Sequence, residues 1–179
     1  KAIQSFSEQV VELDHIIRRM ILESLGLEKY LKERLESTSY LLRMMKYKTN
    51  VTILYQNQID GFEVQTKDGK WIHVKPSPDS FIAMIGDSLC AWTNGRVHSP
   101  YHRVMMSGND ARDSTGLFSV PKEGYVIKAP EELVDEEHPL LFKPFDFAQF
   151  LDFCKSEAGQ RATSHLKTFC GVQDLPLFT

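Results

Sequence analysis

The sequence is poor in several features that would point to particular classes of protein. Its three cysteines, Cys90, Cys154 and Cys170, are too few and too scattered for a disulfide framework or a zinc knuckle. No apolar run approaches the roughly 20 residues that a membrane-spanning helix needs, and there is no run of basic residues. We therefore expect a cytoplasmic protein that binds neither a membrane nor nucleic acid.

The signatures of nucleotide binding and of nucleophilic hydrolysis are also absent from the sequence. It has no Gly-rich phosphate loop and no nucleophile elbow, and its Ser, Cys and His residues show no spacing that suggests a triad. The 179 residues, 42% of them hydrophobic, are enough to bury the core of one domain. We expect a monomeric, globular protein whose partner is a small molecule.

Helices are predicted at both ends of the chain. Apolar residues recur at steps of three and four in the first part, which predicts an amphipathic helix that ends near Gly26. These positions are Val10, Leu13, Ile17, Met20 and Ile21. Residues 28–35 predict a second, shorter helix. Near the other end Asp146 predicts an N-cap with Gln149 as its capping-box partner, followed by an apolar stripe at Phe147, Phe150, Leu151 and Cys154.

The middle of the chain predicts short strands. Apolar, β-compatible runs alternate with turn-forming residues, and they cover residues 40–47, 51–56, 61–65, 71–74 and 81–85. Short strands at this regular spacing are typical of an antiparallel sandwich or barrel. The acidic stretch at residues 131–137 is predicted to be a solvated loop or helix face.

Two more β-compatible runs flank residues 107–110, which have strong turn chemistry, and together they predict a β-hairpin. The runs cover residues 104–106 and 114–120. If the loop has three residues, His102 faces Ser114 and Val104 faces Arg112, all on one face of the sheet. A loop of four residues would put the side chains of the two strands on opposite faces.

Arg112 and Ser114 form a candidate anion site. Residues two apart on a strand point the same way, and a guanidinium beside a hydroxyl suits bidentate capture of a carboxylate. An isolated Arg-x-Ser is more often a surface pair, but here His102, a possible metal ligand, lies ten residues before Arg112. This spacing favours one pocket for a metal and an anion.

Several motifs occur in the order found in one family of plant enzymes. Residues 52–61 (Thr-Ile-Leu-Tyr-Gln-Asn-Gln-Ile-Asp-Gly) are followed by Asp-Gly-Lys-Trp, Ile-Gly-Asp-Ser and Thr-Asn-Gly-Arg motifs and by the segment 102–114. This order resembles plant 2-oxoglutarate- and iron(II)-dependent dioxygenases. Residues 143–171 resemble the branch that includes glucosinolate side-chain-modifying dioxygenases, auxin-oxidising dioxygenases and deoxypodophyllotoxin synthase. The motifs are specific for the family but not for one substrate.

The resemblance implies a mainly β fold with flanking helices, a double-stranded β-helix or jelly roll that is incomplete relative to the family. We expect a single dioxygenase-like domain over residues 1–179. Its helical lead-in would cover residues 1–36, its jelly-roll strands residues 40–121 and its C-terminal helices residues 146–170.

The resemblance also implies a site for Fe(II), held by two histidines and one carboxylate, with 2-oxoglutarate as co-substrate and ascorbate as reductant. His102 resembles one of the iron-binding histidines. Arg112 and Ser114 resemble the pair that holds the far carboxylate of 2-oxoglutarate, and Tyr47 resembles a tyrosine that supports this grip. Phe118 would face the substrate, and no residue is assigned an acid–base role. The implied reaction oxidises a small plant metabolite or hormone and converts 2-oxoglutarate to succinate.

The sequence departs from the family at the metal motif. The family carries His-x-Asp before the Thr-Ile-Leu strand, but none of the six histidines here is followed two residues later by Asp or Glu. Either the sequence omits a loop after Lys48, and an N-terminal region, that the polypeptide contains, or the chain lacks them. We favour omission, because the other pocket motifs keep their order and long active-site loops are where disorder concentrates. Otherwise we expect an inactive paralogue or, at most, a binding protein.

Overall fold

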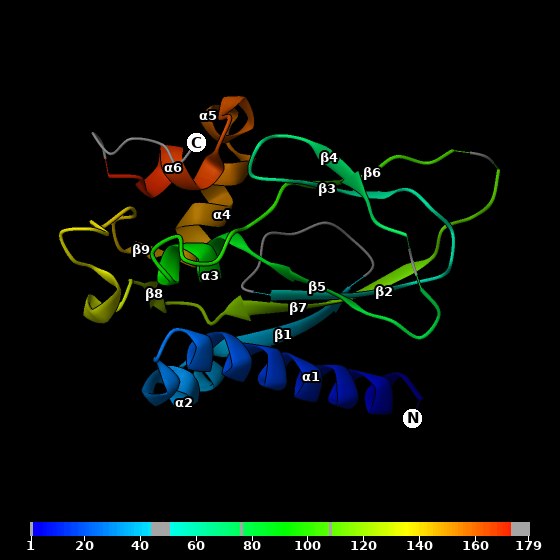
Figure 1. Ribbon diagram of the computed structural model, residues 1–179, viewed down its shortest axis with the longest axis horizontal. Helices are drawn as coiled ribbons and strands as arrows, with labels where there is room; N and C mark the ends of the chain where they lie inside the picture. The colour runs from blue at the N-terminus through cyan, green and yellow to red at the C-terminus, as the bar shows by residue number, and fades with distance from the viewer. Residues whose placement is uncertain (1, 44–50, 76, 108, 173–179) are drawn as a thin grey trace.

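The computed structural model describes residues 2–43, 51–75, 77–107 and 109–172, and Figure 1 shows antiparallel sheets flanked by helices. The strands are β1 (Thr38–Arg43), β2 (Val51–Gln56), β3 (Phe62–Gln65), β4 (Trp71–His73), β5 (Ile82–Ile85), β6 (His102–Val104), β7 (Ser114–Pro121), β8 (Val126–Ile127) and β9 (Phe145–Asp146). The α-helices are α1 (Ala2–Ser24), α2 (Leu31–Glu36), α3 (Asp87–Trp92), α4 (Phe147–Lys155), α5 (Glu157–Arg161) and α6 (His165–Cys170). Two 3-10 helices are η1 (Glu28–Tyr30) and η2 (Glu131–Leu133).

The strands form two main sheets and one small ribbon. The large sheet has the order β1-β7-β2-β5, the small sheet β4-β3-β6, and β8 pairs with β9. In Figure 1 the large sheet lies between α1 on one side and the small sheet on the other. The predicted mainly β fold with flanking helices is confirmed. Within the described ranges, no helix combines the length and hydrophobicity needed to cross a membrane.

The predicted hairpin is wrong, because its two strands belong to different sheets. His102 pairs with Val64 of β3, and Ser114 pairs with Gln56 of β2. The second predicted run is a strand, β7, but the first overlaps β6 only at Val104, and the chain passes from one sheet to the other between β6 and β7. Strand pairing is decided by which faces can be buried together, and a turn signal between neighbouring runs does not contain that information.

The first helix is confirmed, but its buried face differs from the apolar stripe in the sequence. Val10 and Leu22 are buried, and between them lie the buried charged residues Asp14 and Arg18. Met20, which the apolar spacing placed on the inner face, is 62% exposed. The helix ends before Gly26, whose φ of 66° is the left-handed conformation that glycine adopts readily at such a position.

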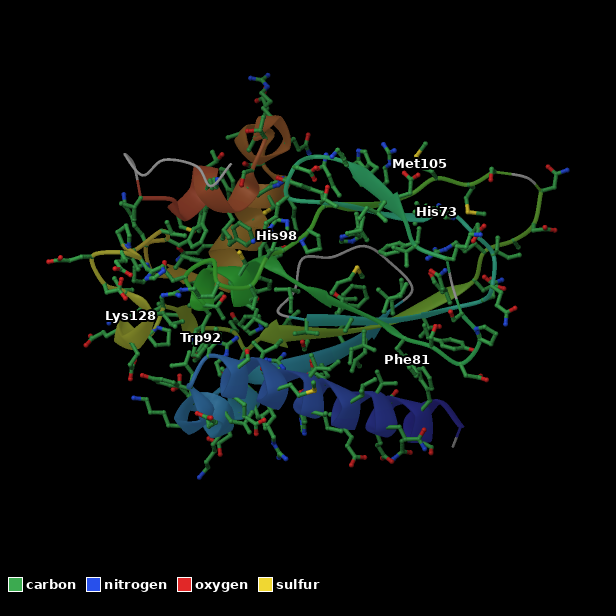
Figure 2. All side chains as sticks on the ribbon, viewed as in Figure 1. His73, Phe81, Trp92, His98, Met105 and Lys128 are labelled. Carbon is green, nitrogen blue, oxygen red and sulfur yellow. The ribbon has the colours of Figure 1, made fainter. Side chains whose placement is uncertain are left out.

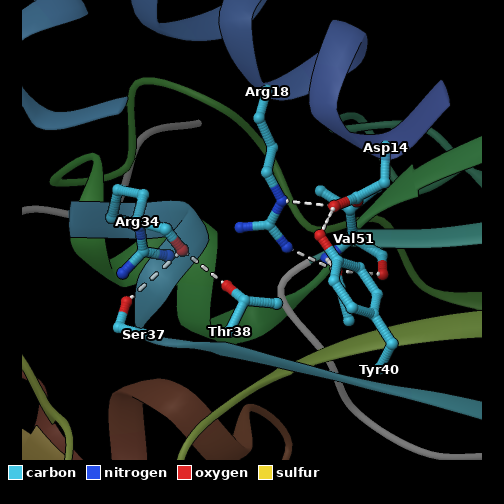
Figure 3. Close-up of polar contacts among 8 residues, drawn as sticks. Asp14, Arg18, Arg34, Ser37, Thr38, Tyr40 and Val51 are labelled. Atoms are coloured by element: carbon cyan, nitrogen blue, oxygen red, sulfur yellow. Dashed lines mark hydrogen bonds and ion pairs between the residues drawn. The ribbon is translucent and has the colours of Figure 1, made fainter. Parts of the chain in front are cut away.

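A buried ion pair docks α1 on the large sheet (Figure 3). The Arg18 Nε donates to Asp14 Oδ2 over 2.6 Å, and the Tyr40 hydroxyl donates to the same oxygen over 2.8 Å. Arg18 Nη2 also donates to Ser119 Oγ of β7 over 2.5 Å, and that hydroxyl donates to the carbonyl oxygen of Val51 over 2.8 Å. Burial, and then the nearby Asp14 carboxylate, raise the pKa of Tyr40 above its usual range. The helix is therefore tied to both central strands.

The C-terminal helices begin as the sequence predicts. The Asp146 carboxylate accepts hydrogen bonds from the backbone N–H groups of Ala148 and Gln149, over 2.8 and 3.1 Å, which is the N-cap interaction. Phe147 and Phe150 are buried in the core cluster, with Leu151 and Cys154 packed against it. These aromatic residues belong to the core, and helices α4, α5 and α6 lie on the side of the molecule away from α1 (Figure 1).

Candidate functional site

Ser114 begins β7 and Arg112 lies two residues before it, and both contribute to the face of the large sheet that is turned away from α1. Ser114 is paired with Gln56, and Thr52 is paired with Phe118. Cross-strand partners, and residues two apart on a strand, share one face of a sheet. The ladder therefore puts Gln56, Ser114 and Phe118 on one face, and the contact of Arg112 Nη1 with Ser114 Oγ, at 3.4 Å, adds Arg112 to it.

The opposite face of the same strands is covered by α1. Ser119 follows Phe118 on β7, so its side chain points to the opposite face, where it binds Arg18 of that helix. Tyr55 precedes Gln56 on β2 and points to the same face as Ser119. Its ring lies 6.4 Å from the ring of Phe6 in α1. The face that carries the candidate anion site is thus the one toward the small sheet, as Figure 1 shows for the two layers.

The guanidinium of Arg112 is half-buried and has no carboxylate partner within the described part of the chain. Its Nη2 donates to the side-chain carbonyl Oε1 of Gln56, and its Nε is buried without a hydrogen-bond partner. Burial lowers the pKa of Arg112 from its usual range, but a guanidinium remains charged in proteins. A positive charge with unused donors is what a carboxylate would complement.

Phe118 is buried on the same face of the large sheet as Ser114, four residues further along β7. Its side chain packs over Gly116, where an added Cβ would lie 2.9 Å from Phe118 Cε2. The absence of a side chain at Gly116 therefore makes room for the phenyl ring. The sequence-based prediction that Phe118 faces the substrate agrees with this placement, but its role stays a prediction.

His102 lies on β6 of the small sheet, on the same face as the buried Phe62. The ladder pairs Val64 with His102 and Phe62 with Val104, and the rings of Phe62 and His102 are 5.8 Å apart. Phe62 is 2% exposed, so this face of the sheet is turned to the interior, although His102 itself is exposed. His102 Nδ1 lies 3.3 Å from the carbonyl oxygen of Pro100. A proton on Nδ1 is stabilised there, which leaves the Nε2 lone pair for a metal.

The outer face of the small sheet is occupied by an ion pair. Arg103 Nε donates to Glu63 over 2.6 Å, and its guanidinium lies 4.0 Å from the centroid of the Trp71 ring. His102 and Arg112 thus belong to different sheets and each lies on an inward face. The structure confirms neither their roles nor a shared ligand, and these stay predictions.

The described residues do not form a complete iron site. No group of three or more His, Cys, Asp or Glu side chains among them is arranged to hold a metal ion. His102 is predicted to supply one of the three ligands that the family uses, and Tyr47 and the junction of Lys48 and Thr49 lie outside the described residues. The described part therefore fits a carboxylate near Arg112 but does not fit an iron by itself.

Sequence reasoning missed Gln56 as a member of the site. It ends β2 and is 7% exposed, and it is a direct partner of both Arg112 and the Ser114 position. The sequence carries no signal for this role, because the burial of the amide becomes visible only in the fold.

A cavity of about 650 Å³ opens elsewhere, between α2, α3 and the segment from Tyr125 to η2. It is lined by aromatic and acidic residues, among them Tyr30, Glu33, Trp92, Tyr125, Glu131 and Glu132. Figure 2 shows Trp92 and Lys128, which both line it, at the end of the molecule away from Met105, which follows β6. Among the described residues, none of the candidates His102, Arg112, Ser114 and Phe118 lines this cavity.

Comparison with known families finds a match in the part of the chain that holds the site. The sequence model of the 2OG-Fe(II) oxygenase superfamily matches residues 33–121, about half of the chain. This range contains His102, Arg112, Ser114 and Phe118.

The relatives found among curated proteins come from Arabidopsis thaliana. The probable 2-oxoglutarate-dependent dioxygenase AOP1.2 is 54% identical over 191 residues, which cover 94% of this chain and 60% of that protein. The 2-oxoglutarate-dependent dioxygenase AOP3 is 34% identical, with 96% of this chain and 70% of that protein covered. The probable inactive 2-oxoglutarate-dependent dioxygenase AOP2 is 32% identical, with 97% and 69% covered. The chain spans about 60% of the length of AOP1.2.

The alignment with AOP1.2 shows that this chain lacks residues inside the matched range. It runs over 191 positions, whereas 94% of 179 residues is about 168, so about 23 positions have no residue of this chain. The matched part of AOP1.2 is therefore longer than its counterpart here.

Solved structures match the fold over most of the chain. JOX2, solved in complex with 2OG, Fe and JA, is 28% identical with a TM-score of 0.82, and 95% of this chain and 56% of that chain are covered. The dioxygenase for auxin oxidation (DAO) in rice is 26% identical with a TM-score of 0.78, with 94% and 63% covered. The predicted jelly roll, incomplete relative to its relatives, is confirmed. The chain belongs to the 2OG-Fe(II) oxygenase superfamily.

Proposed function

We propose that this protein is a 2-oxoglutarate- and Fe(II)-dependent oxygenase that oxidises a small plant metabolite or hormone and converts 2-oxoglutarate to succinate. The observation that carries the proposal is the half-buried Arg112 guanidinium on an inward sheet face, beside Ser114 and without a carboxylate partner in the described ranges. A permanent cation in such a place calls for an anionic ligand, because burial of an unpaired charge is unfavourable.

The carboxylate site in this proposal consists of Arg112 and Ser114, with Tyr47 as a supporting hydroxyl. A guanidinium offers five N–H donors in a fixed plane, and the structure uses one on Gln56 and another, at 3.4 Å, on Ser114. The remaining donors suit the far carboxylate of 2-oxoglutarate. Phe118, on the same face, would shape the pocket for the substrate.

The iron site is the incomplete part of the proposal. His102 would supply one ligand, through the nitrogen that does not face Pro100. The other two would come from a His-x-Asp motif of the family, in residues that this sequence lacks. Ascorbate would serve as the reductant that keeps the iron ferrous.

An alternative function is a binding protein for 2-oxoglutarate-like acids without turnover. The sequence has no His-x-Asp or His-x-Glu, and no group of three possible metal ligands occurs among the described residues. One relative, AOP2, is named as probably inactive. These observations favour the alternative if the sequence is read without additional residues.

The remaining proposals follow from the sequence. We propose one dioxygenase-like domain over residues 1–179, acting as a monomer in the cytoplasm on a small molecule, with no nucleic acid or membrane partner. The scattered cysteines support the reducing compartment, and burial raises the pKa values of Cys90 and Cys170, to about 11 and about 12. Both thiols are therefore protonated and unreactive near neutral pH.

Turnover distinguishes the two functions. The protein is incubated with Fe(II), ascorbate, 2-oxoglutarate and a panel of plant metabolites, and succinate and product masses are measured. We expect succinate formation that is lost in His102→Ala and retained in His73→Ala, an exposed histidine on the outer face of the small sheet. Binding of 2-oxoglutarate without succinate would favour the alternative. Absence of both binding and succinate would contradict both functions.

A further inference from the structure

Gln56 is buried at the point where β2 meets the start of β7. It lies directly across from Ser114 in the ladder, and its side chain contacts Arg112, two residues before Ser114. Three polar side chains from two strands thus gather on the inward face of the large sheet. Of the three, Gln56 is classed as buried, whereas Arg112 and Ser114 are half-buried.

The contact with Arg112 fixes which way the Gln56 amide points. A guanidinium only donates hydrogen bonds, so the amide atom that faces Arg112 Nη2 must be the carbonyl Oε1. The NH2 group of Gln56 is then turned away from the guanidinium. It is buried, and it has no acceptor within the described ranges.

The same place holds a second unused donor, the buried Nε–H of Arg112. Buried polar groups nearly always have a hydrogen-bond partner, because leaving one unpaired costs free energy. Two unpaired donors on neighbouring side chains, next to a positive charge, share one complement: a group with several acceptor lone pairs and a negative charge. A carboxylate has this chemistry.

We propose that Gln56 is a positioning residue of the carboxylate site, whose carbonyl holds the Arg112 guanidinium and whose NH2 group donates to the bound carboxylate. The inference rests on the proposed function, since it takes 2-oxoglutarate as the ligand. Both donor atoms are covered by their surroundings. The side chains of Gln56 and Arg112 therefore move together to open these donors as the carboxylate enters, and Gln56 keeps its bond to Nη2.

A purely structural role makes a different prediction. If Gln56 only braced β2 against β7, its replacement would change the stability of the protein and weaken every ligand of the pocket to a similar extent. If Gln56 contacts the far carboxylate, its replacement selectively weakens the binding of 2-oxoglutarate. The replacement then has little effect on the binding of 2-oxobutyrate, which has the same keto-acid end and no far carboxylate.

The decisive variant is Gln56→Glu, which keeps an acceptor for Arg112 and replaces the NH2 donor with a charged oxygen. The new carboxylate pairs with the guanidinium and repels the ligand. Gln58→Glu is the matched control, because Gln58 is exposed two residues along the chain and undergoes the same change. Gln56→Met, of similar volume, removes both hydrogen bonds without adding charge.

Binding is measured by titration calorimetry on variants whose folding has been verified by thermal unfolding. The probes are 2-oxoglutarate and 2-oxobutyrate, with Mn²⁺ in place of Fe(II). We expect the Kd for 2-oxoglutarate to rise at least about 30-fold in Gln56→Glu, from loss of a charge-assisted contact, and roughly 3- to 10-fold in Gln56→Met. Gln58→Glu should stay within about twofold, and the preference for 2-oxoglutarate over 2-oxobutyrate should fall only in the Gln56 variants.

The outcomes separate this inference from the proposed function. If the unaltered protein binds 2-oxoglutarate and Gln56→Glu binds it equally well, or loses both acids in parallel, the role of Gln56 is wrong and the oxygenase proposal stands. If the unaltered protein binds no 2-oxoglutarate, both fail.

Discussion

Each face of the large sheet holds an arginine, and the two faces differ in how the charge of that arginine is balanced. On the face covered by α1, Arg18 is 2% exposed and its charge is balanced by Asp14, with Tyr40 and Ser119 completing the network. On the inward face, Arg112 has an amide and a hydroxyl as neighbours and no carboxylate within the described ranges. Both faces retain buried side-chain atoms without a partner among the described residues, Asp14 Oδ1 on one and Gln56 Nε2 and Arg112 Nε on the other.

The difference is therefore one of charge balance. A buried ion pair where a helix meets a sheet has a structural role, because removing one partner leaves the other charge unpaired in the interior. An uncompensated guanidinium on an inward face is a poor structural element and a good ligand site. Each prediction below tests one side of this contrast.

The largest effect on stability is expected from Arg18→Met. The substitution leaves the Asp14 carboxylate buried without its counter-charge, which should lower the free energy of unfolding by about 3 to 5 kcal/mol. Denaturant unfolding measures it. Arg19→Met is the control, since Arg19 is exposed on the same helix. Equal losses of unfolding free energy in the two variants would show that the buried ion pair stabilises the protein no more than an exposed arginine does.

The Tyr40 hydroxyl should matter less than Arg18. Tyr40→Phe removes one hydrogen bond to a carboxylate, and we expect a loss of about 1.5 to 3 kcal/mol. Because the pKa of Tyr40 is raised in the folded protein, only the unfolded chain ionises above the usual tyrosine pKa, so stability falls as pH rises beyond it. That alkaline loss should be smaller in Tyr40→Phe. Tyr55→Phe, on the same sheet face but 40% exposed, should leave stability unchanged.

Gly116→Ala tests the packing of the inward face. The new Cβ would lie 2.9 Å from the Phe118 ring, and overpacking of this kind costs typically about 1 to 3 kcal/mol. Adding Phe118→Leu should recover part of the loss in thermal unfolding, because the smaller side chain makes room. If the double variant loses the full sum of the stability lost in the two single variants, the new Cβ does not clash with the Phe118 ring.

Arg112→Met should have the smallest effect on stability. We expect a change of less than about 1 kcal/mol, because the side chain leaves no charge partner behind when it is removed. A loss comparable to that of Arg18→Met in the same denaturant experiment would mean that Arg112 is a structural residue, and the contrast between the two faces would disappear.

The local structure could be predicted from the sequence, and the long-range pairing could not. The run from Val51 to Gln56 is a strand with the predicted bounds, and Asp146 caps its helix as predicted. Helix α3 was missed, because six residues are too few to show a helical period. The hairpin was wrong because the partner of His102 is Val64, almost forty residues earlier, and no local signal contains that choice.

For the candidate site, too, local features could be predicted from the sequence and long-range contacts could not. Residue parity correctly placed Arg112 and Ser114 on one face, and the family resemblance supplied the roles that parity cannot give. Gln56 and Asp14 were missed for one reason: a hydrophobic pattern reads a polar residue as solvent-facing, whereas both are buried. Only the partners that the fold brings to a polar group reveal why it is buried.

The central claim is that Arg112 serves a ligand, and 2-oxoglutarate binding tests it most directly. Titration calorimetry compares the unaltered protein with Arg112→Met and with Arg103→Met, which removes an arginine from the outer face of the small sheet. The account predicts that Arg112→Met weakens binding by about 10- to 150-fold, the equivalent of roughly 1.5 to 3 kcal/mol, and that Arg103→Met leaves it unchanged. Unchanged affinity in Arg112→Met would contradict the account.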